Sequence, residues 1–241
     1  MLVKTKLMTQ WWQSPLGQYV LTHEQNSLQS LEQYFHGFFH LQVYGEKNIL
    51  PQVSHTTTQA LMADQADLNG RAELLPFKSH SIDKLLLPHV LEFSSNPHQV
   101  LREAERVLVA DGSIILCCFN PISLWGLRNV CSWHGRPPWQ GYFFTQRRIK
   151  DWLGLLNFEV VATKKLLFSP PIDNKTWLAK LARMDRWGKR CWPFFGGATI
   201  LVATKRTIPL TPIKSRWRYK QFFPSGRFVK KPVTRWSSKP E

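Results

Sequence analysis

The sequence lacks the cysteine and histidine patterns of disulfide-bonded and zinc-binding proteins. Only four of its 241 residues are cysteine, no two form a CxxC pair, and the eight histidines form neither an HExxH motif nor a Cys/His cluster. It also lacks a run of eighteen apolar residues and, in its first thirty residues, the order of a secretory signal. These absences predict a cytoplasmic protein with reduced thiols, no metal site and no transmembrane segment.

Acidic residues are scarce, because 16 Asp and Glu face 32 Lys and Arg and leave a net charge of +16. Residues 205–241 hold eleven of these cations and one acidic residue, a net +10. Prolines recur in this segment, and no apolar period that could build a core is present. We therefore predict a domain over residues 1–204 and a basic, Pro-containing, disordered tail over residues 205–241.

A strand, a capped helix and a second strand follow one another in the middle of the chain. Ile82 to Leu87 is a compact apolar run, and Pro88 stops it. Asn96 and Pro97 have the types expected at the cap and first position of a helix. Ile114 to Phe119 is another apolar run, so the unit is a βαβ crossover, which predicts an α/β fold with neighbouring parallel strands.

The remaining segments predict further helices and strands around this unit. Apolar residues at three- and four-residue spacing predict an amphipathic helix from Glu24 to Phe39. An insertion over residues 170–196 contains Trp and Arg residues at helical spacing. The other predicted elements are strands at His40–Tyr44, Thr57–Met62, Ala66–Gly70, Phe158–Phe168 and Ala198–Thr204, and a helix at Arg147–Leu156.

Five short runs follow one another in the middle of the chain: Glu73-Leu74-Leu75-Pro76-Phe77, Ser81-Ile82-Asp83, His89-Val90-Leu91-Glu92-Phe93, Leu101-Arg102-Glu103 with Arg106-Val107-Leu108, and Asp111-Gly112. In this order they resemble the central block of type 11 methyltransferases, whose pattern reads roughly AExLPF, SFD, HVLEH, LREIxRVL and PGG. A later run, Phe119 to Arg128, resembles a little-characterised bacterial branch of that family with the pattern FNPxSLWGLR.

The resemblance implies the fold of class I S-adenosylmethionine-dependent methyltransferases. That fold is Rossmann-like: a mostly parallel, seven-stranded sheet is flanked by helices, and its last strand is antiparallel. S-Adenosylmethionine binds at the carboxyl ends of the strands, as ligands do in open α/β sheets. The implied cofactor-binding residues are Tyr44, Gly45, Asp64, Ala72, Glu73, Pro88 and His89.

The glycine-rich turn of the family is degenerate in this sequence. The family places several glycines after its first strand because backbone must approach the cofactor closely. The corresponding stretch, Val43 to Asn48, holds Gly45 alone. Asp64 lies 19 residues beyond Gly45, near the spacing of a carboxylate that binds the ribose. Arg71 stands where the family carries an acidic residue.

Two residues are candidates for a catalytic role. His89 follows the presumed strand at Pro88, and an imidazole titrates near neutrality, so it could act as a base or substrate contact; a structural histidine bonded to backbone is the alternative. Asn120 precedes Pro121, and some methyltransferases place an Asn-Pro pair here to receive an amino group. The same pair is a common turn signal.

Three segments leave alternatives open. The run from Ser123 to Arg128 could form a lid over the substrate or pack in the core. The insertion from Asn174 to Trp192 could dock on a membrane surface, cover the pocket or pack within the molecule. The tail could bind RNA, because its cations can neutralise phosphates and its aromatics can stack on bases. The prediction is therefore a methyltransferase of unknown acceptor, or else an inactive binding module with its fold.

Overall fold

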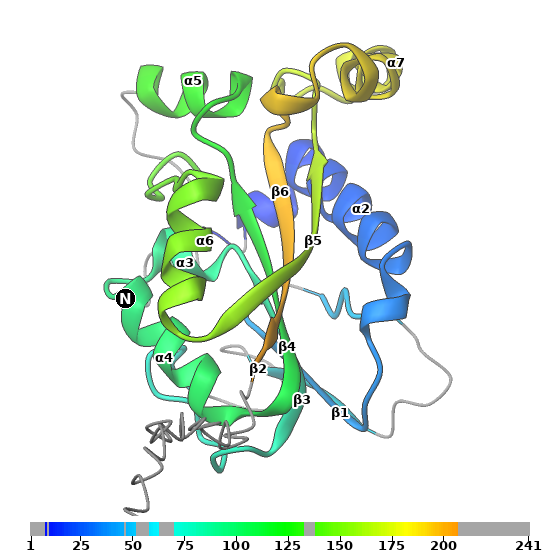
Figure 1. Ribbon diagram of the computed structural model, residues 1–241. Helices are drawn as coiled ribbons and strands as arrows, with labels where there is room; N and C mark the ends of the chain where they lie inside the picture. The colour runs from blue at the N-terminus through cyan, green and yellow to red at the C-terminus, as the bar shows by residue number, and fades with distance from the viewer. Residues whose placement is uncertain are drawn as a thin grey trace, which may run out of the picture. The chain divides into compact units, whose positions relative to one another are not determined.

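The computed structural model of the chain describes residues 8, 10–45, 47–51, 58–62, 70–132 and 138–206. All of them belong to the unit that spans Met1–Thr207. Figure 1 shows one sheet through the middle of this unit, with helices on both of its faces. The unit has the three layers of an α/β fold, as the sequence predicts.

Within the described residues the sheet has six strands, one fewer than the seven that the resemblance implies, in the order β2-β1-β3-β4-β6-β5. β1 is parallel to β2 and β3, and β3 is parallel to β4, whereas β6 is antiparallel to both of its neighbours. This confirms the predicted mostly parallel sheet with an antiparallel last strand. The strands are β1 (Phe39–Val43), β2 (Thr58–Met62), β3 (Ile82–Pro88), β4 (Leu108–Phe119), β5 (Phe158–Leu166) and β6 (Ala198–Lys205).

The helices cover the two faces of this sheet unequally. In Figure 1, α2 lies on one side of the strands, and α3, α4 and α6 lie on the other, while α5 and α7 sit near the ends of β4 and β6. The helices are α2 (Pro15–Gln29), α3 (Val90–Phe93), α4 (Pro97–Val107), α5 (Leu124–Cys131), α6 (Gln146–Leu155) and α7 (Lys175–Cys191), with short 3-10 turns η1 (Glu32–Tyr34) and η2 (Pro193–Phe195).

Two apolar cores form because successive strand residues point to opposite faces. In β3, Leu85 and Leu87 pack with α4 and α6, whereas Leu86 packs with α2 on the other face. All three side chains are almost completely buried. A strand that is buried on both faces reads as a continuous apolar run, and this is the pattern that Ile82 to Leu87 shows in the sequence.

The sequence signals at the start of α4 have the roles predicted for them. The side chain of Asn96 accepts a hydrogen bond from the backbone N–H of Gln99 at 3.2 Å, and Pro97 is the first helical residue. Thr145 caps α6 in the same way through the backbone N–H of Arg148. The structure also confirms, within a residue or two, the predicted helix at Arg147–Leu156 and the predicted strands at His40–Tyr44, Thr57–Met62, Phe158–Phe168 and Ala198–Thr204.

The predicted helix from Glu24 to Phe39 is wrong in its bounds. α2 begins at Pro15, where the side chain of Ser14 accepts a hydrogen bond from the N–H of Gly17, and it ends at Gln29. Gly37 has a φ of +137°, which interrupts a helix, and Phe39 already belongs to β1. The phenylalanines at 38 and 39 are exposed rather than core residues. The predicted strand at Ala66–Gly70 lies outside the described residues except for Gly70.

Candidate functional site

The carboxyl ends of β1 and β3 meet where the strand order changes direction. The chain passes from β1 outward to β2 and then returns to β3 on the other side of β1. Gly45 follows β1, and a Cβ added to it would lie 3.7 Å from Cγ of Pro88, the last residue of β3. Open α/β sheets bind ligands at such a switch point. Two predicted cofactor positions, Gly45 and Pro88, thus lie side by side at this point.

Gln42, buried in β1, fixes the turn that follows the strand. Its Nε2 donates to the backbone oxygens of Tyr44 and Lys47, at 3.1 and 2.8 Å, and its Oε1 accepts from the N–H of Ile49 at 2.9 Å. Gly45 has a φ of +119°, and a Cβ there would lie 2.6 Å from Nε2 of Gln42. This position therefore requires glycine, and the turn has one defined conformation.

Tyr44 joins this turn to the segment that begins at Gly70. Its backbone also has a positive φ, of 63°, and its hydroxyl donates to the backbone oxygen of Gly70 at 3.2 Å. The ring packs against the core on the α4 side. Because the predicted cofactor residues Ala72 and Glu73 come after Gly70 and Arg71 in the sequence, this bond connects the two sides between which an adenosyl group is expected.

Glu73 has one carboxylate oxygen engaged and one without a hydrogen bond. Oε1 accepts from the hydroxyl of Ser94 at 2.7 Å. Oε2 is buried and has no hydrogen-bond partner among the described residues, and its nearest cation is Nε of Arg71 at 3.9 Å. Ala72 is 2% exposed. A buried acceptor of this kind is able to bind an N–H or O–H group of a ligand.

His89, directly after β3, lies between two carboxylates. Its Nε2 is 2.7 Å from Oε1 of Glu24 on α2, and its Nδ1 is 3.1 Å from Oε1 of Glu92 on α3. Oε1 of Glu92 also accepts from the backbone N–H of Phe119, at 2.7 Å. The imidazole stacks on the ring of Phe119, with centroids 4.0 Å apart, and all three ionisable side chains are buried.

The two carboxylates determine the charge of His89. Burial opposes a positive charge on the ring, but the attraction of Glu24 and Glu92 and their hydrogen bonds outweigh it and raise the pKa of His89 to about 10. Both nitrogens face oxygens that only accept, so both carry protons. His89 is therefore an imidazolium near neutral pH. Burial raises the pKa of the neighbouring Cys117 thiol, and the negative charges of Glu24 and Glu92 raise it further.

Asn120, at the end of β4, uses its side chain to hold the surrounding loops. Its Nδ2 donates to the backbone oxygens of Ile122 and Gly196, both at 3.0 Å, and its Oδ1 accepts from the N–H of Ile122 at 3.1 Å. The residue is 9% exposed. This arrangement agrees with the turn alternative for the Asn-Pro pair, because the amide group is already engaged within the molecule.

Sequence comparison decides the family. The family model of the type 11 methyltransferases, described as a methyltransferase domain, matches residues 40–116. The uncharacterised protein YafS of Escherichia coli K12 is 36% identical over 186 residues, which cover 75% of this chain and 74% of YafS. The chain belongs to the type 11 methyltransferase family.

Solved structures show the same Rossmann-like fold at low sequence identity. A SAM-dependent methyltransferase of Thermotoga maritima, described as a possible histamine N-methyltransferase, has a TM-score of 0.57 at 15% identity and covers 82% of this chain and 94% of its own. A SAM-dependent methyltransferase of Archaeoglobus fulgidus has a TM-score of 0.50 at 12% identity, covering 75% and 92%. The [4+2]-cyclase SpnF also has a TM-score of 0.50, at 14% identity and covering 76% and 81%, so this fold hosts more than one reaction.

The strand tips fit the cofactor of this family in part. Oε2 of Glu73 is an acceptor without a hydrogen bond among the described residues, which fits a ligand, whereas the side chain of Gln42 fills the space next to Gly45. The hydroxyl of Tyr44 already bonds across the expected adenosyl position to Gly70. Asp64, the predicted ribose ligand, lies outside the described residues, as does the tail from residue 207.

Glu24 is one of the residues of this site that sequence reasoning missed. It lies on the buried side of α2 with Val20, Leu21 and Leu28, at helical spacing, and is completely buried. Burial of an acidic side chain costs free energy unless the side chain is paired. An acidic residue within the apolar stripe of a helix therefore indicates a buried polar partner. The shifted bounds of the predicted helix hid it, since Glu24 was placed at the first turn rather than in the middle.

Trp125 of the FNPxSLWGLR run belongs to the core. It is completely buried and stacks on Phe119, with centroids 5.5 Å apart, and its indole N–H donates to the backbone oxygen of Ser169 at 3.0 Å. Gly197 packs against the ring so closely that a Cβ would lie 2.2 Å from it. Packing is therefore the alternative that describes Trp125, whereas Leu124 and Leu127 of the same run are exposed.

A depression between α2 and α7 lies apart from the predicted cofactor residues. It has a volume of about 530 Å³, and Gln18, Tyr19, His23 and Leu178 are among the residues that line it.

Within the described parts of the chain, no group of three His, Cys, Asp or Glu side chains could hold a metal ion. Among the helices that the structure describes, none has the length and hydrophobicity needed to cross a membrane.

Proposed function

We propose that this protein is an S-adenosylmethionine-dependent methyltransferase that holds its cofactor at the tips of β1 and β3. The observation that supports this most is the pairing of Gly45 with Pro88 at the switch point of a parallel sheet, in a chain that belongs to a methyltransferase family. The proposal does not specify the methyl acceptor. A cytoplasmic location is part of the same proposal and rests on four unpaired cysteines.

In this proposal each side of the site has a separate role. When bound, S-adenosylmethionine supplies an electrophilic methyl group, so the protein needs chiefly to align an acceptor with it. The turn at Tyr44 and Gly45 holds one end of the cofactor, Ala72 and Glu73 contact the adenosyl part, and Asp64 binds the ribose. Pro88 and the backbone of His89 form the wall between them.

We further propose that the side chains of His89 and Asn120 position the loops and do not touch the reacting atoms. Both ring nitrogens of His89 are bonded to carboxylates, and its side chain is 1% exposed. The side-chain amide of Asn120 bonds to the backbone of Ile122 in its own loop and of Gly196 in the loop before β6. The alternative, that either side chain acts directly on the acceptor, stays a prediction.

The test is calorimetric titration of the full chain with S-adenosylmethionine and S-adenosylhomocysteine. We expect binding by the wild type, a loss of about tenfold or more in Gly45→Leu, and no change in Gly154→Leu. The last variant is a matched control because a Cβ added at position 154 of α6 would meet nothing within 4 Å. No heat at millimolar cofactor would contradict the proposal.

A second candidate function is an inactive binding module that keeps the fold. The bond between Tyr44 and Gly70 favours it, because this bond crosses the position expected for the adenosyl group. If the protein is such a module, the substitutions Gly45→Leu and Asp64→Ala have no measurable effect in any assay of cofactor binding. RNA is the partner proposed for such a module, through residues 205–241; an affinity for RNA that is insensitive to salt, or unchanged when these residues are deleted, would contradict this.

A further inference from the structure

Exposed apolar side chains gather on α5 and on the segment from α7 to η2. On α5 and the turn before it, Ile122, Leu127 and Val130 are 60%, 60% and 85% exposed. On α7, Trp187 is 72% exposed, and Phe194 of η2 is 74% exposed. Nine of the fifteen large apolar side chains that are exposed in the described part of the chain belong to these two segments: Ile122, Leu124, Leu127, Val130, Trp177, Trp187, Trp192, Phe194 and Phe195.

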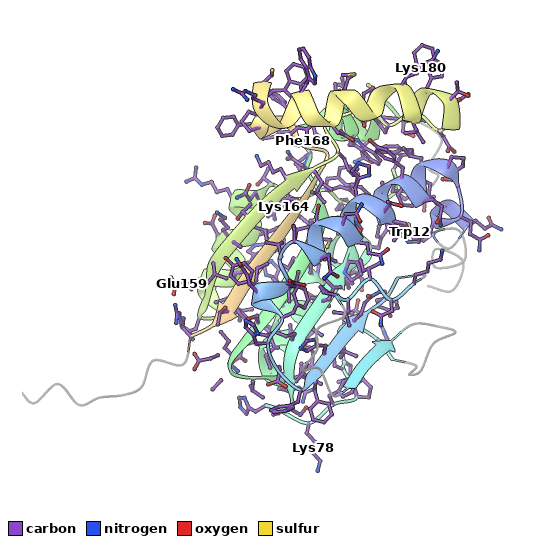
Figure 2. All side chains as sticks on the ribbon, turned by 90° about the vertical axis from the view of Figure 1, so that its right-hand side faces the viewer. Trp12, Lys78, Glu159, Lys164, Phe168 and Lys180 are labelled. Atoms are coloured by element: carbon purple, nitrogen blue, oxygen red, sulfur yellow. The ribbon has the colours of Figure 1, made fainter. Side chains whose placement is uncertain are left out.

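These two segments form one surface, which we call the α5–α7 cap. Nδ2 of Asn120, just before α5, donates to the backbone oxygen of Gly196, just after η2. The guanidinium of Arg128 on α5 donates to the backbone oxygen of Pro171, just before α7. In Figure 2, α7 lies along the same end of the sheet at which α5 lies in Figure 1. This is the end at which β4 finishes, the edge of the proposed cofactor site.

One side of α7 is fixed to the domain, and the opposite side faces outward. Leu178 and Gly188 are buried, and a Cβ on Gly188 would lie 2.4 Å from Cβ of Phe168. Trp187 lies nine residues beyond Leu178, which places it half a turn around the helix from this contact. Figure 2 shows the side chain of Lys180 extending away from the sheet. The outward side of α7 therefore carries both tryptophan and lysine.

The charge of α7 is strongly positive, and its acidic residue faces inward. Between Lys175 and Cys191 the sequence has six Lys and Arg residues and one acidic residue, Asp185. Asp185 accepts from the backbone N–H of Ser169 at 2.8 Å and from the hydroxyl of Tyr19. The remaining charged residues of the helix are all cations. A surface of tryptophan, aliphatic side chains and cations is complementary to an anionic bilayer.

We propose that the α5–α7 cap docks on the surface of anionic lipid bilayers, and that this brings the edge of the proposed cofactor site to the membrane. Aliphatic side chains such as Leu127 and Val130 favour a bilayer over RNA, because RNA offers phosphates and base faces but no apolar layer. The outward tryptophans match the preference of this side chain for the membrane interface. The proposal does not depend on methyl transfer.

The test is flotation of the full chain with vesicles of phosphatidylcholine alone and of phosphatidylcholine with phosphatidylglycerol. We expect binding to the anionic vesicles only, and a loss of about tenfold when Leu127→Ser and Trp187→Ala are combined. Leu155→Ser is the matched control, since Leu155 is 80% exposed at the end of α6, next to the start of β5. Binding that the double variant leaves unchanged would assign it to residues 205–241 and overturn the proposal.

The native cysteines provide a second readout that needs no truncation. Cys131 ends α5 and Cys191 ends α7, and both thiols are exposed, whereas Cys117 and Cys118 are buried. A polarity-sensitive fluorophore on Cys131 and Cys191 should shift to shorter wavelength with phosphatidylglycerol vesicles. An unchanged spectrum while the protein floats with the vesicles would contradict the proposal. The proposal would also be contradicted if the double variant bound a single-stranded RNA oligonucleotide more weakly than the wild type but bound vesicles equally well.

Discussion

Nε2 of His89 lies 2.7 Å from Oε1 of Glu24, so α2 is bonded directly to the turn at the tip of β3. The contact joins residues 65 positions apart in the sequence. His89 has a φ of 53°, in the left-handed region that is unfavourable for most side chains, and the two carboxylates and the ring of Phe119 hold it there. Removing one charge from this cluster therefore affects both α2 and the turn at the tip of β3.

The free energy of unfolding should fall as pH rises above neutrality, because His89 loses its proton in this range. Its pKa is raised from 6.5 to about 10 in the folded state, so folding holds this proton more tightly than the unfolded chain does. The resulting stabilisation is complete below about pH 6.5 and is lost as pH rises towards 10, at up to about 1.4 kcal/mol per pH unit. Urea unfolding at several pH values measures it.

The variant His89→Gln removes the titrating group and should flatten this pH dependence while lowering stability at pH 6.5. His36→Gln, at an exposed histidine, is the control and should retain the wild-type dependence. If the wild type and His89→Gln differ by the same free energy at pH 6.5 and pH 9.5, the proposed imidazolium is contradicted.

Gln42→Met should lower the free energy of unfolding by about 3 kcal/mol, because it leaves two backbone oxygens and one N–H of the turn without their partner. Chemical denaturation measures this effect. Gln25→Met, on the exposed side of α2, is the matched control and should change stability by less than about 0.5 kcal/mol. Equal effects of the two substitutions would show that Gln42 does not hold the turn.

Most of the sheet could be predicted because its signals are local. The apolar run from Ile82 to Leu87 and the cap at Asn96 lie within a few residues of the elements that they define. The crossover rule then gives parallel neighbours without any knowledge of distant contacts. The ordered motifs added the family, and with it the antiparallel last strand.

The polar contacts of the site could not be predicted, because they join distant parts of the chain. Glu24 and His89 are brought together by the packing of α2 on the sheet, and Tyr44 meets Gly70 only after β1 and β3 have paired. The role of Gln42 was equally hidden, since a glutamine in a strand gives no sign of the turn that it will bind. Asp64 and the tail beyond residue 206 lie outside the described residues, and their roles stay predictions.

Asn120→Ala should destabilise the fold by about 2 kcal/mol, since it removes the side-chain hydrogen bonds from the end of β4 to the backbone of Gly196 and of Ile122. If Asn120 has a positioning role, its effect on cofactor affinity should be small once the variant is folded. Asn26→Ala, at an exposed position of α2, is the control. Thermal unfolding gives the first quantity, and calorimetric titration gives the second. A variant of unchanged stability would contradict the positioning role.

Asp185→Asn should loosen α7, because it weakens the hydrogen bonds from Ser169 and Tyr19 that fix the helix. Partial burial of the Tyr19 hydroxyl and its hydrogen bond to this carboxylate both raise the pKa of Tyr19. Hydrogen exchange of the α7 amides should accelerate about tenfold, while exchange in β3 stays unchanged. Asp151→Asn, on the exposed side of α6, should have no effect on α7. Equal protection of α7 in all three proteins would contradict this anchoring.

The central claim, that the tips of β1 and β3 bind S-adenosylmethionine, is tested most directly by native mass spectrometry of the full chain with the cofactor. A single adduct of the cofactor's mass should form on the wild type and on Gly154→Leu, and should be absent from folded Gly45→Leu. An adduct on none of the three proteins, or equally on all three, would contradict the site.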